Sequence, residues 1–320
     1  MTNPYFQKSF FSFFFLLFSR LVCFLSFQGD GVLAPDELQI LVFSGISISS
    51  AFVGSFLLLR KMTMLANCLS HTILFGIALV FLLGPSFGFD FQFSDFPIFA
   101  MLVAAVLSAV LSAFFTSFLQ THAKLEHDSS IALTFNLFFA LGVILISVFL
   151  RSSHIAMDAV MGNADILSFA DLQLVFAVML INCLLMLLFF KEYELSSFDP
   201  CMAKSMGLPQ SFLNYLLTFQ LAITVVAAFR AVGVLLVLAF LLIPPLSARL
   251  FVSRLRPMIA LAMLIGIFCS CIAVAFGRHL LSAHQIALPS ASLLACVMAL
   301  FYVLSLCLVN SLRKPKQVKE

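Results

Sequence analysis

Charged residues are scarce in this chain. Of its 320 residues, 10% are Asp, Glu, Lys or Arg, whereas 63% are hydrophobic, and the mean hydropathy is +1.16. A soluble domain carries about 25% charged and about 45–50% apolar residues, so no soluble shape could bury this much apolar surface. The length alone would allow two domains, but the apolar runs continue almost from end to end. We therefore expect one polytopic membrane domain.

Several enzyme motifs are also missing. The sequence contains no G-x-x-x-x-G-K-[ST] phosphate loop and no H-E-x-x-H pair, so energy from ATP would have to come from another chain. Its eight cysteines form no C-x-x-C pair and are expected to be small buried thiols. It has no basic stripe of the kind that binds nucleic acid. The interiors of its apolar runs lack Asp and Glu, which argues against a transporter driven by an ion gradient and against an intramembrane enzyme.

What the chain has in abundance is apolar runs long enough to cross a bilayer. A spanning helix needs about 20 mostly apolar residues. Nine such runs follow the N-terminal region, at approximately 38–59, 64–83, 97–119, 129–150, 170–190, 210–229, 231–248, 258–276 and 287–310. We expect an all-α protein with about nine transmembrane helices. Arg230 interrupts the long run 210–248 and predicts a tight turn.

The positions of Lys and Arg orient these runs, because both residues favour cytoplasmic loops. If the first run begins outside, twelve of the 17 Lys and Arg residues lie in cytoplasmic loops, three in outer loops and two upstream. We expect an N-terminal apolar segment and outer linker at 1–36, a membrane domain at 37–312 and a basic cytoplasmic tail at 313–320. Residues 9–27 form an uncleaved span, an interfacial helix or a signal peptide, and we favour the first two because no small-residue cleavage site follows.

One polar loop, at residues 196–211, has the signals of a short helix. Asp199 suits the N-cap, Pro200 the first helical position and Gly207 a left-handed C-terminal position, while Pro209 prevents continuation. The helix CMAKSM would have about two turns and be marginal alone in water, so it needs a partner surface. It is a docking element for a cytoplasmic protein or a plain connector.

A second set of polar residues lies where hydrocarbon is expected. Asn67 and His71 are four residues apart, and Cys68 and His71 three apart, which places them on one helix face. Polar groups in the membrane usually face a bundle interior or a water-filled cavity, and imidazole with an amide oxygen suits a transition metal. His71 either lines a metal path or donates a hydrogen bond to a neighbouring helix.

Other polar residues are weaker candidates. Asp158 and His154, four apart in a predicted outer loop, could receive a cation or could be an ordinary solvated loop. His279 and His284 flank another outer loop. Further expectations concern structure: interhelical hydrogen bonds from Asn136, Asn182 and Gln220, an N-cap at Asp128 and Ser129, and an ended or kinked helix at Pro244-Pro245.

Three segments together resemble one family. FDPCMAKSMGLP with TFQLAITVVAAFRAVGVLLVLAFLLIPPLSARL, LRKMTMLANCLSHTILFGIALVFLLG, and KLEHDSSIALTFNLFFALGVILIS occur in the order seen in metal-type ABC importer permeases. The resemblance covers roughly residues 38–310. It implies a multi-pass permease of the bacterial inner membrane that imports zinc, manganese or iron and holds no permanently bound cofactor.

The resemblance also implies partners. They are two ABC ATPase subunits that use the ATP, a periplasmic or surface metal-binding protein, and a second permease, identical or paralogous. It places the helix from Ala203 to Gly207, with Lys204 on it, in a groove of each ATPase. Two departures stand out. The family pattern is similar to G-D-A-L-S-H, with Asp where this chain has Asn67, and the family usually has His near the position of Asp158.

Overall fold

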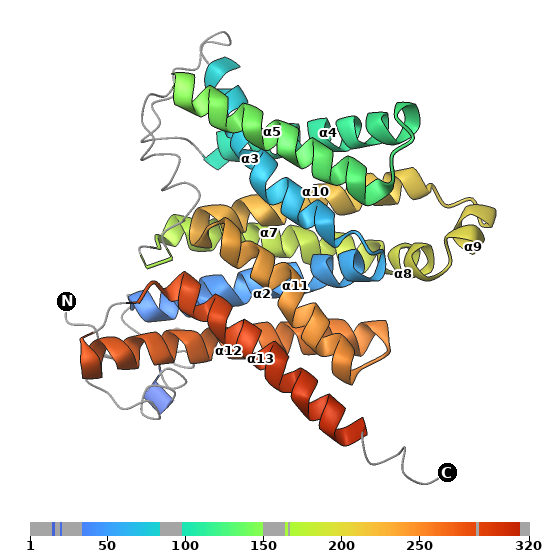
Figure 1. The fold of residues 1–320 in the computed structure, drawn as a ribbon. Coiled ribbons are helices and arrows are strands. Elements are labelled where there is room, and N and C mark those ends of the chain that lie inside the picture. Colours follow the sequence, from blue (N-terminus) through green and yellow to red (C-terminus); the bar gives the residue numbers. More distant parts are fainter. Residues whose placement is uncertain are drawn as a thin grey trace, which may run out of the picture. The chain divides into compact units, whose positions relative to one another are not determined.

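The structure is a computed structural model that describes residues 15–16, 20, 34–83, 98–149, 164–165, 167–285 and 288–313 (Figure 1). Within these ranges the regular structure is helical, with no strand. The helices are α2 (Pro35–Leu59), α3 (Thr63–Leu83), α4 (Ile98–His122), α5 (His127–Phe149), α7 (Phe169–Leu188), α8 (Phe190–Phe198), α9 (Pro200–Ser205), α10 (Gln210–Val232), α11 (Val234–Phe251), α12 (Leu255–His284) and α13 (Ser290–Arg313).

The all-helical architecture is therefore confirmed, and a helix covers each of the nine predicted apolar runs. Six helices in the described ranges are long and apolar enough to cross a membrane, namely those of α2, α5, α7, α10, α12 and α13. Shorter apolar helices lie at Val106–His122 and Leu236–Phe251. Nine crossings remain a prediction. The N-terminal span and the basic tail also remain predictions, because most of their residues lie outside the described ranges.

The chain falls into two compact units. Unit 1 comprises Met1–Ser55, Asn163–Leu180 and Ala239–Glu320. Unit 2 comprises Phe56–Gly162 and Ile181–Leu238. Helices α2, α7 and α11 thus contribute residues to both.

In unit 2, α3 packs against α4, α5 and α10. Gly76 of α3 faces the carbonyl oxygen of Ala104 in α4, and a Cβ at Gly76 would lie 2.2 Å from that oxygen. Gly142 of α5 lies against α3, where a Cβ would come within 2.9 Å of the backbone nitrogen of Phe75. Small residues let membrane helices approach this closely. The polar face of α3 is therefore held in a tightly packed group of helices.

In unit 1, close contacts again depend on glycine. A Cβ at Gly54 of α2 would lie 2.1 Å from the carbonyl oxygen of Leu241 in α11, and a Cβ at Gly266 of α12 would lie 1.9 Å from the Oγ of Ser47. Helix α12 also packs against α13. These contacts leave no room for a methyl group, so the glycines set the approach of α2 to α11 and α12.

The predicted turn at Arg230 is wrong in position. Helix α10 continues through Arg230 to Val232, and the break falls at Gly233, whose φ is 84°. Glycine adopts a positive φ without the steric cost that a Cβ imposes. The N–H of Gly233 still donates to the carbonyl of Phe229 at 3.0 Å. The turn therefore follows backbone freedom, whereas the charge was a misleading signal.

Two further expectations concern helix ends. Pro244 and Pro245 lie inside α11, which continues to Phe251, so they do not end it, and the alternative of a kink stays a prediction. Pro245 cannot donate to the Leu241 carbonyl one turn earlier, and that carbonyl packs against Gly54 instead. In α5, which begins at His127, Asp128 lies in the first turn and does not cap it, although a carboxylate there still suits the helix dipole.

Candidate functional site

The short helix α9 (Pro200–Ser205) begins as the sequence predicts. Asp199 is its N-cap, and the Asp199 side chain accepts a 2.9 Å hydrogen bond from the backbone N–H of Met202. Pro200 lies in the first turn. The N–H groups there have no acceptor within the helix, so the missing N–H of proline costs no hydrogen bond. The start of the helix is therefore fixed by one side chain and one ring.

The C-terminal end of α9 is fixed by backbone geometry. Gly207 has a φ of 80°, and its N–H donates to the carbonyl of Lys204 at 3.1 Å. The N–H of Leu208 donates to the carbonyl of Ala203 at 3.0 Å. This pair of bonds is a Schellman motif, which needs a left-handed residue at the glycine position. The predicted roles of Asp199, Pro200 and Gly207 at the two ends are confirmed, and the helix between them is Pro200–Ser205, one residue earlier than CMAKSM.

One side of α9 is buried and the rest is open. Ala203 is fully buried, whereas Cys201 and Lys204 are exposed. Around them, the large apolar side chains of Met202, Met206 and Phe198 are 51%, 64% and 59% exposed. Clustered apolar side chains at a polar loop mark an interaction surface. Helix α9 thus presents a rigid, capped and partly apolar surface.

The second candidate site is the N-terminal half of α3. Cys68 is buried, and Asn67 and His71 are half-buried. The imidazole of His71 lies against α5, with its ring centroid 5.2 Å from that of Phe135 and 5.5 Å from that of Phe139. Asn67 and His71 are thus two polar side chains of intermediate exposure, one turn apart, and the imidazole packs against two aromatic rings of α5.

Within the described residues of a single chain, Asn67, Cys68 and His71 do not make a complete metal-binding site. Among the described residues, no three His, Cys, Asp or Glu side chains are close enough together to hold a metal ion. Asp158 and His154 lie outside the described residues. The pair of Asn67 and His71 therefore offers an amide and an imidazole but no carboxylate, a donor set suited to weak, reversible binding of a transition metal.

Two of the amides expected to form interhelical hydrogen bonds do so. Asn182 of α7 donates from Nδ2 to Thr224 Oγ1 of α10 at 2.6 Å, and Gln220 Oε1 of α10 accepts from the hydroxyl of Tyr193 in α8 at 3.1 Å. Asn136 is exposed on α5, and within the described part of the chain it has no partner. Of the two outer histidines, His279 is half-buried, and the side chain of His284 lies outside the described part.

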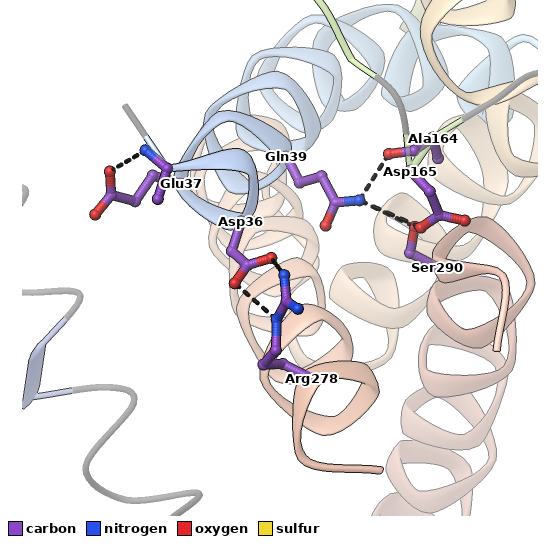
Figure 2. Close-up of polar contacts among 8 residues, drawn as sticks. Asp36, Glu37, Gln39, Ala164, Asp165, Arg278 and Ser290 are labelled. Atoms are coloured by element: carbon purple, nitrogen blue, oxygen red, sulfur yellow. Dashed lines mark hydrogen bonds and ion pairs between the residues drawn. The ribbon is translucent and has the colours of Figure 1, made fainter. Parts of the chain in front are cut away.

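A polar cluster that the sequence did not reveal lies in unit 1 (Figure 2). Asp36, in the first turn of α2, accepts two hydrogen bonds from the guanidinium of Arg278 in α12, one of them from Nε at 2.8 Å. The Asp36 side chain is 5% exposed and that of Arg278 18%. Planar, two-bond pairing of Arg with carboxylate is among the stronger polar interactions in proteins. It ties the start of α2 to the last third of α12.

Gln39, one turn further along α2, extends the cluster. Its Nε2 donates to the carbonyl of Ala164 at 2.7 Å and to Ser290 Oγ at 3.3 Å, and Ser290 also donates to Asp165 (Figure 2). The cluster borders a cavity of about 450 Å³ in unit 1. It joins the starts of α2 and α13 to the residues before α7.

No local sequence signal marks this cluster. Asp36 and Arg278 are separated by 242 residues, and no local pattern connects them. Asp36 alone looks like an ordinary first-turn carboxylate, and Arg278 looks like a loop cation after an apolar run. Only the packing of α12 beside α2 brings the charges together.

Comparisons with known proteins agree with the resemblance found in the three segments. Residues 38–309 match the model of the ABC 3 transport family. A Chlamydia muridarum protein named "Probable metal transport system membrane protein" is 36% identical over 307 residues, which cover 96% of this chain and 95% of that protein. The manganese transport system membrane protein MntC of Listeria monocytogenes is 31% identical, over 77% of this chain and 84% of its own length.

A solved structure is also similar. The structure of PsaBC from Streptococcus pneumoniae in complex with a Fab superposes with a TM-score of 0.70 and 28% identity, and the match covers 84% of this chain and 90% of that one. An inward-facing metal-chelate type ABC transporter has a TM-score of 0.61 at 19% identity, which shows the fold alone.

Proposed function

This chain belongs to the ABC 3 transport family, and we propose that it is the membrane-spanning permease subunit of an ATP-driven importer of a divalent transition metal. The match over residues 38–309 carries this conclusion. Permeases of ABC transporters work with ATPase and substrate-binding partners and have no ATPase site of their own. The missing phosphate loop agrees with this division of labour. We place the protein in the bacterial inner membrane.

Manganese is the metal that we propose. Two relatives have names that state the transported metal. They are manganese transport system membrane proteins of Listeria monocytogenes and Bacillus subtilis, at 31% and 33% identity. Within this chain, Asn67 supplies an amide oxygen and His71 an imidazole, both acceptable to Mn²⁺. Neither group excludes Zn²⁺ or Fe²⁺, so the test compares all three.

We assign ATPase docking to α9. Its support is the geometry of a helix that is capped at both ends, with Asp199 at one end and Gly207 at the other. Ala203 packs inward, and Lys204 with the exposed Met202 faces outward. A short helix held this rigidly can be displaced as one piece by a partner, because it has few internal degrees of freedom to absorb the motion.

We assign the metal path to the polar face of α3, formed by Asn67, Cys68 and His71. Its support is the placement of a half-buried imidazole and amide in a helix whose other side chains are mostly apolar. Asp158 and His154, which lie outside the described residues, are proposed as outer contacts that receive the cation from the binding protein. The absent carboxylate at Asn67 keeps the affinity low, which favours release.

We also propose that a second permease copy covers α5. Asn136 is exposed in the middle of this helix, beside the exposed Leu133 and Leu137. An amide facing hydrocarbon is costly, and amides commonly hydrogen-bond across helix interfaces in membranes. A copy packed on this face would cover Asn136. We expect copies that carry Asn136→Cys to form a disulfide with each other. The control variant Leu184→Cys, on α7, should form none.

The transport cycle then follows the alternating-access scheme. The loaded binding protein docks on the outer loops, and the metal passes along the α3 face. Closure of the ATPases on ATP displaces α9 and changes which end of the path is open. The chain itself binds and positions, and hydrolysis takes place on the partner.

The test is reconstitution of the permease with its ATPase and metal-binding protein in lipid vesicles. ATP hydrolysis and metal uptake are measured with Mn²⁺, Zn²⁺ and Fe²⁺ in parallel. We expect ATP-dependent uptake, with Mn²⁺ giving the largest stimulation. Uptake that continues without ATP and collapses with the proton or sodium gradient would refute the ABC assignment. Stimulation by Zn²⁺ or Fe²⁺ alone would refute manganese but not the transporter class.

A further inference from the structure

The residue after α2, Arg60, connects three helices of unit 2. Its Nε donates to Ser197 Oγ of α8 at 3.0 Å, and its Nη1 donates to Asn214 Oδ1 of α10. Its Cζ also lies 5.6 Å from the centre of the Tyr193 ring in α8. One guanidinium thus holds the end of α2, the middle and end of α8 and the first turns of α10 together. We refer to Arg60, Tyr193, Ser197 and Asn214 as the Arg60 cluster.

Tyr193 gives the cluster a buried centre. The residue is fully buried, and its ring packs on Phe56 with a centroid distance of 5.4 Å. Burial raises the pKa of the Tyr193 phenol, and the charge of Arg60 opposes this only in part. The phenol therefore stays protonated and donates to Gln220 Oε1 at 3.1 Å.

From Gln220 the polar contacts continue along α10. The hydroxyl of Thr224 donates to the carbonyl of Gln220 at 2.7 Å, and Asn182 Nδ2 of α7 donates to the Thr224 hydroxyl at 2.6 Å. Gln220, Thr224 and Asn182 are all buried. A series of polar contacts between neighbouring residues therefore leads from Arg60 through Tyr193 and Gln220 to the buried part of α7 in unit 2.

The Arg60 cluster is also joined to α9 through the backbone. The N–H of Asp199 donates to the carbonyl of Leu195 at the end of α8 at 2.9 Å, while its side chain caps α9. Ser197 Oγ, which accepts from Arg60, donates to the carbonyl of Tyr193 at 2.6 Å. Because α8 and α9 share Asp199, a displacement of α9 acts directly on α8.

The surroundings of the Arg60 guanidinium fix its position but compensate its charge poorly. Among the described residues, no carboxylate forms an ion pair with it, and its Nη2 is buried without a partner. Burial lowers the pKa of Arg60, and only Tyr193 opposes this. A partly buried cation held by a hydroxyl, an amide and a ring is a costly arrangement. Its benefit is that a planar fork fixes three helices at once, which the point charge of Lys cannot do.

We propose that Arg60 is a positioning residue of the transport cycle, which clamps α8 to the ends of α2 and α10 so that displacement of α9 is passed to the spans. Without the clamp, α8 yields and the motion of α9 is lost before it reaches α2 and α10. This inference rests on the proposed function. It concerns the link between ATP hydrolysis and metal movement, not the docking of the ATPase.

Two variants test the clamp in the reconstituted complex of permease, ATPase and metal-binding protein. Arg60→Lys keeps the charge but removes the fork, and Tyr193→Phe removes one buried oxygen from the series. The measured quantity is the number of Mn²⁺ ions taken up per ATP hydrolysed. Because Arg60→Lys removes the fork that contacts α8 and α10 at once, we expect this ratio to fall by about tenfold or more in Arg60→Lys, and by a smaller factor in Tyr193→Phe. Complex assembly and ATP hydrolysis are expected to stay near wild type.

Arg249→Lys is the matched control, because Arg249 is an exposed arginine near the end of α11, on the side predicted to face the cytoplasm. Its ratio should equal that of the wild type. Wild-type ratios in both Arg60→Lys and Tyr193→Phe would overturn the inference. So would failed assembly of Arg60→Lys together with a wild-type ratio in Tyr193→Phe, because that pattern indicates a purely structural role. A wild-type complex that shows no ATP-dependent uptake of any metal would instead refute the proposed function.

Discussion

Asp36 and Arg278 form a two-bond ion pair in unit 1, although 242 residues separate them in the chain. The carboxylate accepts from both Nε and Nη2 of the guanidinium, and the Asp36 side chain is 5% exposed. The pair joins the first turn of α2 to α12. It is the main charged contact between these two helices in the described part of unit 1.

Arg278→Ala should destabilise the permease by about 3 kcal/mol, because removing one partner leaves a buried carboxylate without its counter-charge. Arg278→Lys should cost less, since it keeps the charge and loses only the fork. The chain contains no tryptophan, so unfolding is best followed by calorimetry or by the soluble fraction that remains after heating in detergent. Equal melting temperatures for Arg278→Ala and wild type would contradict the role of the pair.

Gly54→Ala should cost about 1–3 kcal/mol, as is usual when extra volume is forced into a packed interior. The added methyl would lie 2.1 Å from the Leu241 carbonyl oxygen, a backbone atom that cannot rotate away. Gly277→Ala is the control, because a Cβ there would meet only Leu293 at an ordinary 3.6 Å. The same thermal measurement should separate the two variants.

Gly207→Val should uncouple ATP hydrolysis from metal uptake while leaving membrane insertion intact. No atom lies within 4 Å of a Cβ at Gly207, so the effect comes from its φ of 80° and not from a clash. A left-handed conformation costs a residue with a Cβ roughly 1–2 kcal/mol, and the C-terminal end of α9 should rearrange. Gly207→Asn should be close to wild type, because Asn tolerates this conformation. Normal uptake by Gly207→Val would refute the prediction.

His71→Ala should lower metal uptake at unchanged assembly with the ATPase. The imidazole lies half-buried against Phe135 and Phe139, so its loss removes a polar group from the proposed path. His122→Ala, at the exposed end of α4, removes a histidine away from that path and should leave uptake unchanged. Wild-type flux for His71→Ala in vesicles would argue against a path along α3.

Asn67→Asp should lower the Mn²⁺ concentration needed for half-maximal ATPase stimulation. A carboxylate beside His71 adds charge attraction for a divalent cation and a harder oxygen donor. Maximal uptake should fall if release becomes slower, so both quantities are measured in one titration. Asn67→Ser is the matched control, because it changes the side chain without adding a charge. An unchanged half-maximal concentration for Asn67→Asp would place the metal elsewhere.

Local patterns in the sequence predict the helices and several of their ends. Within the described ranges, apolar run lengths located the long helices, because lipid demands about 20 apolar residues whatever their partners are. Asp199, Pro200 and Gly207 fixed α9, because caps act through bonds only a few residues long. His71 and Asn67 were found as polar exceptions in an apolar helix. These signals are local, so they can be read without knowing the fold.

Contacts between distant residues appear only in the folded structure. The turn at Gly233 is an exception, because it follows from the local backbone freedom of glycine and not from a distant contact. The structure showed that Pro245 leaves α11 intact, since the freed Leu241 carbonyl packs against Gly54. It alone paired Asp36 with Arg278 and gathered the Arg60 cluster. Contacts between residues far apart in sequence arise from helix packing, and no local pattern in the chain encodes which faces meet.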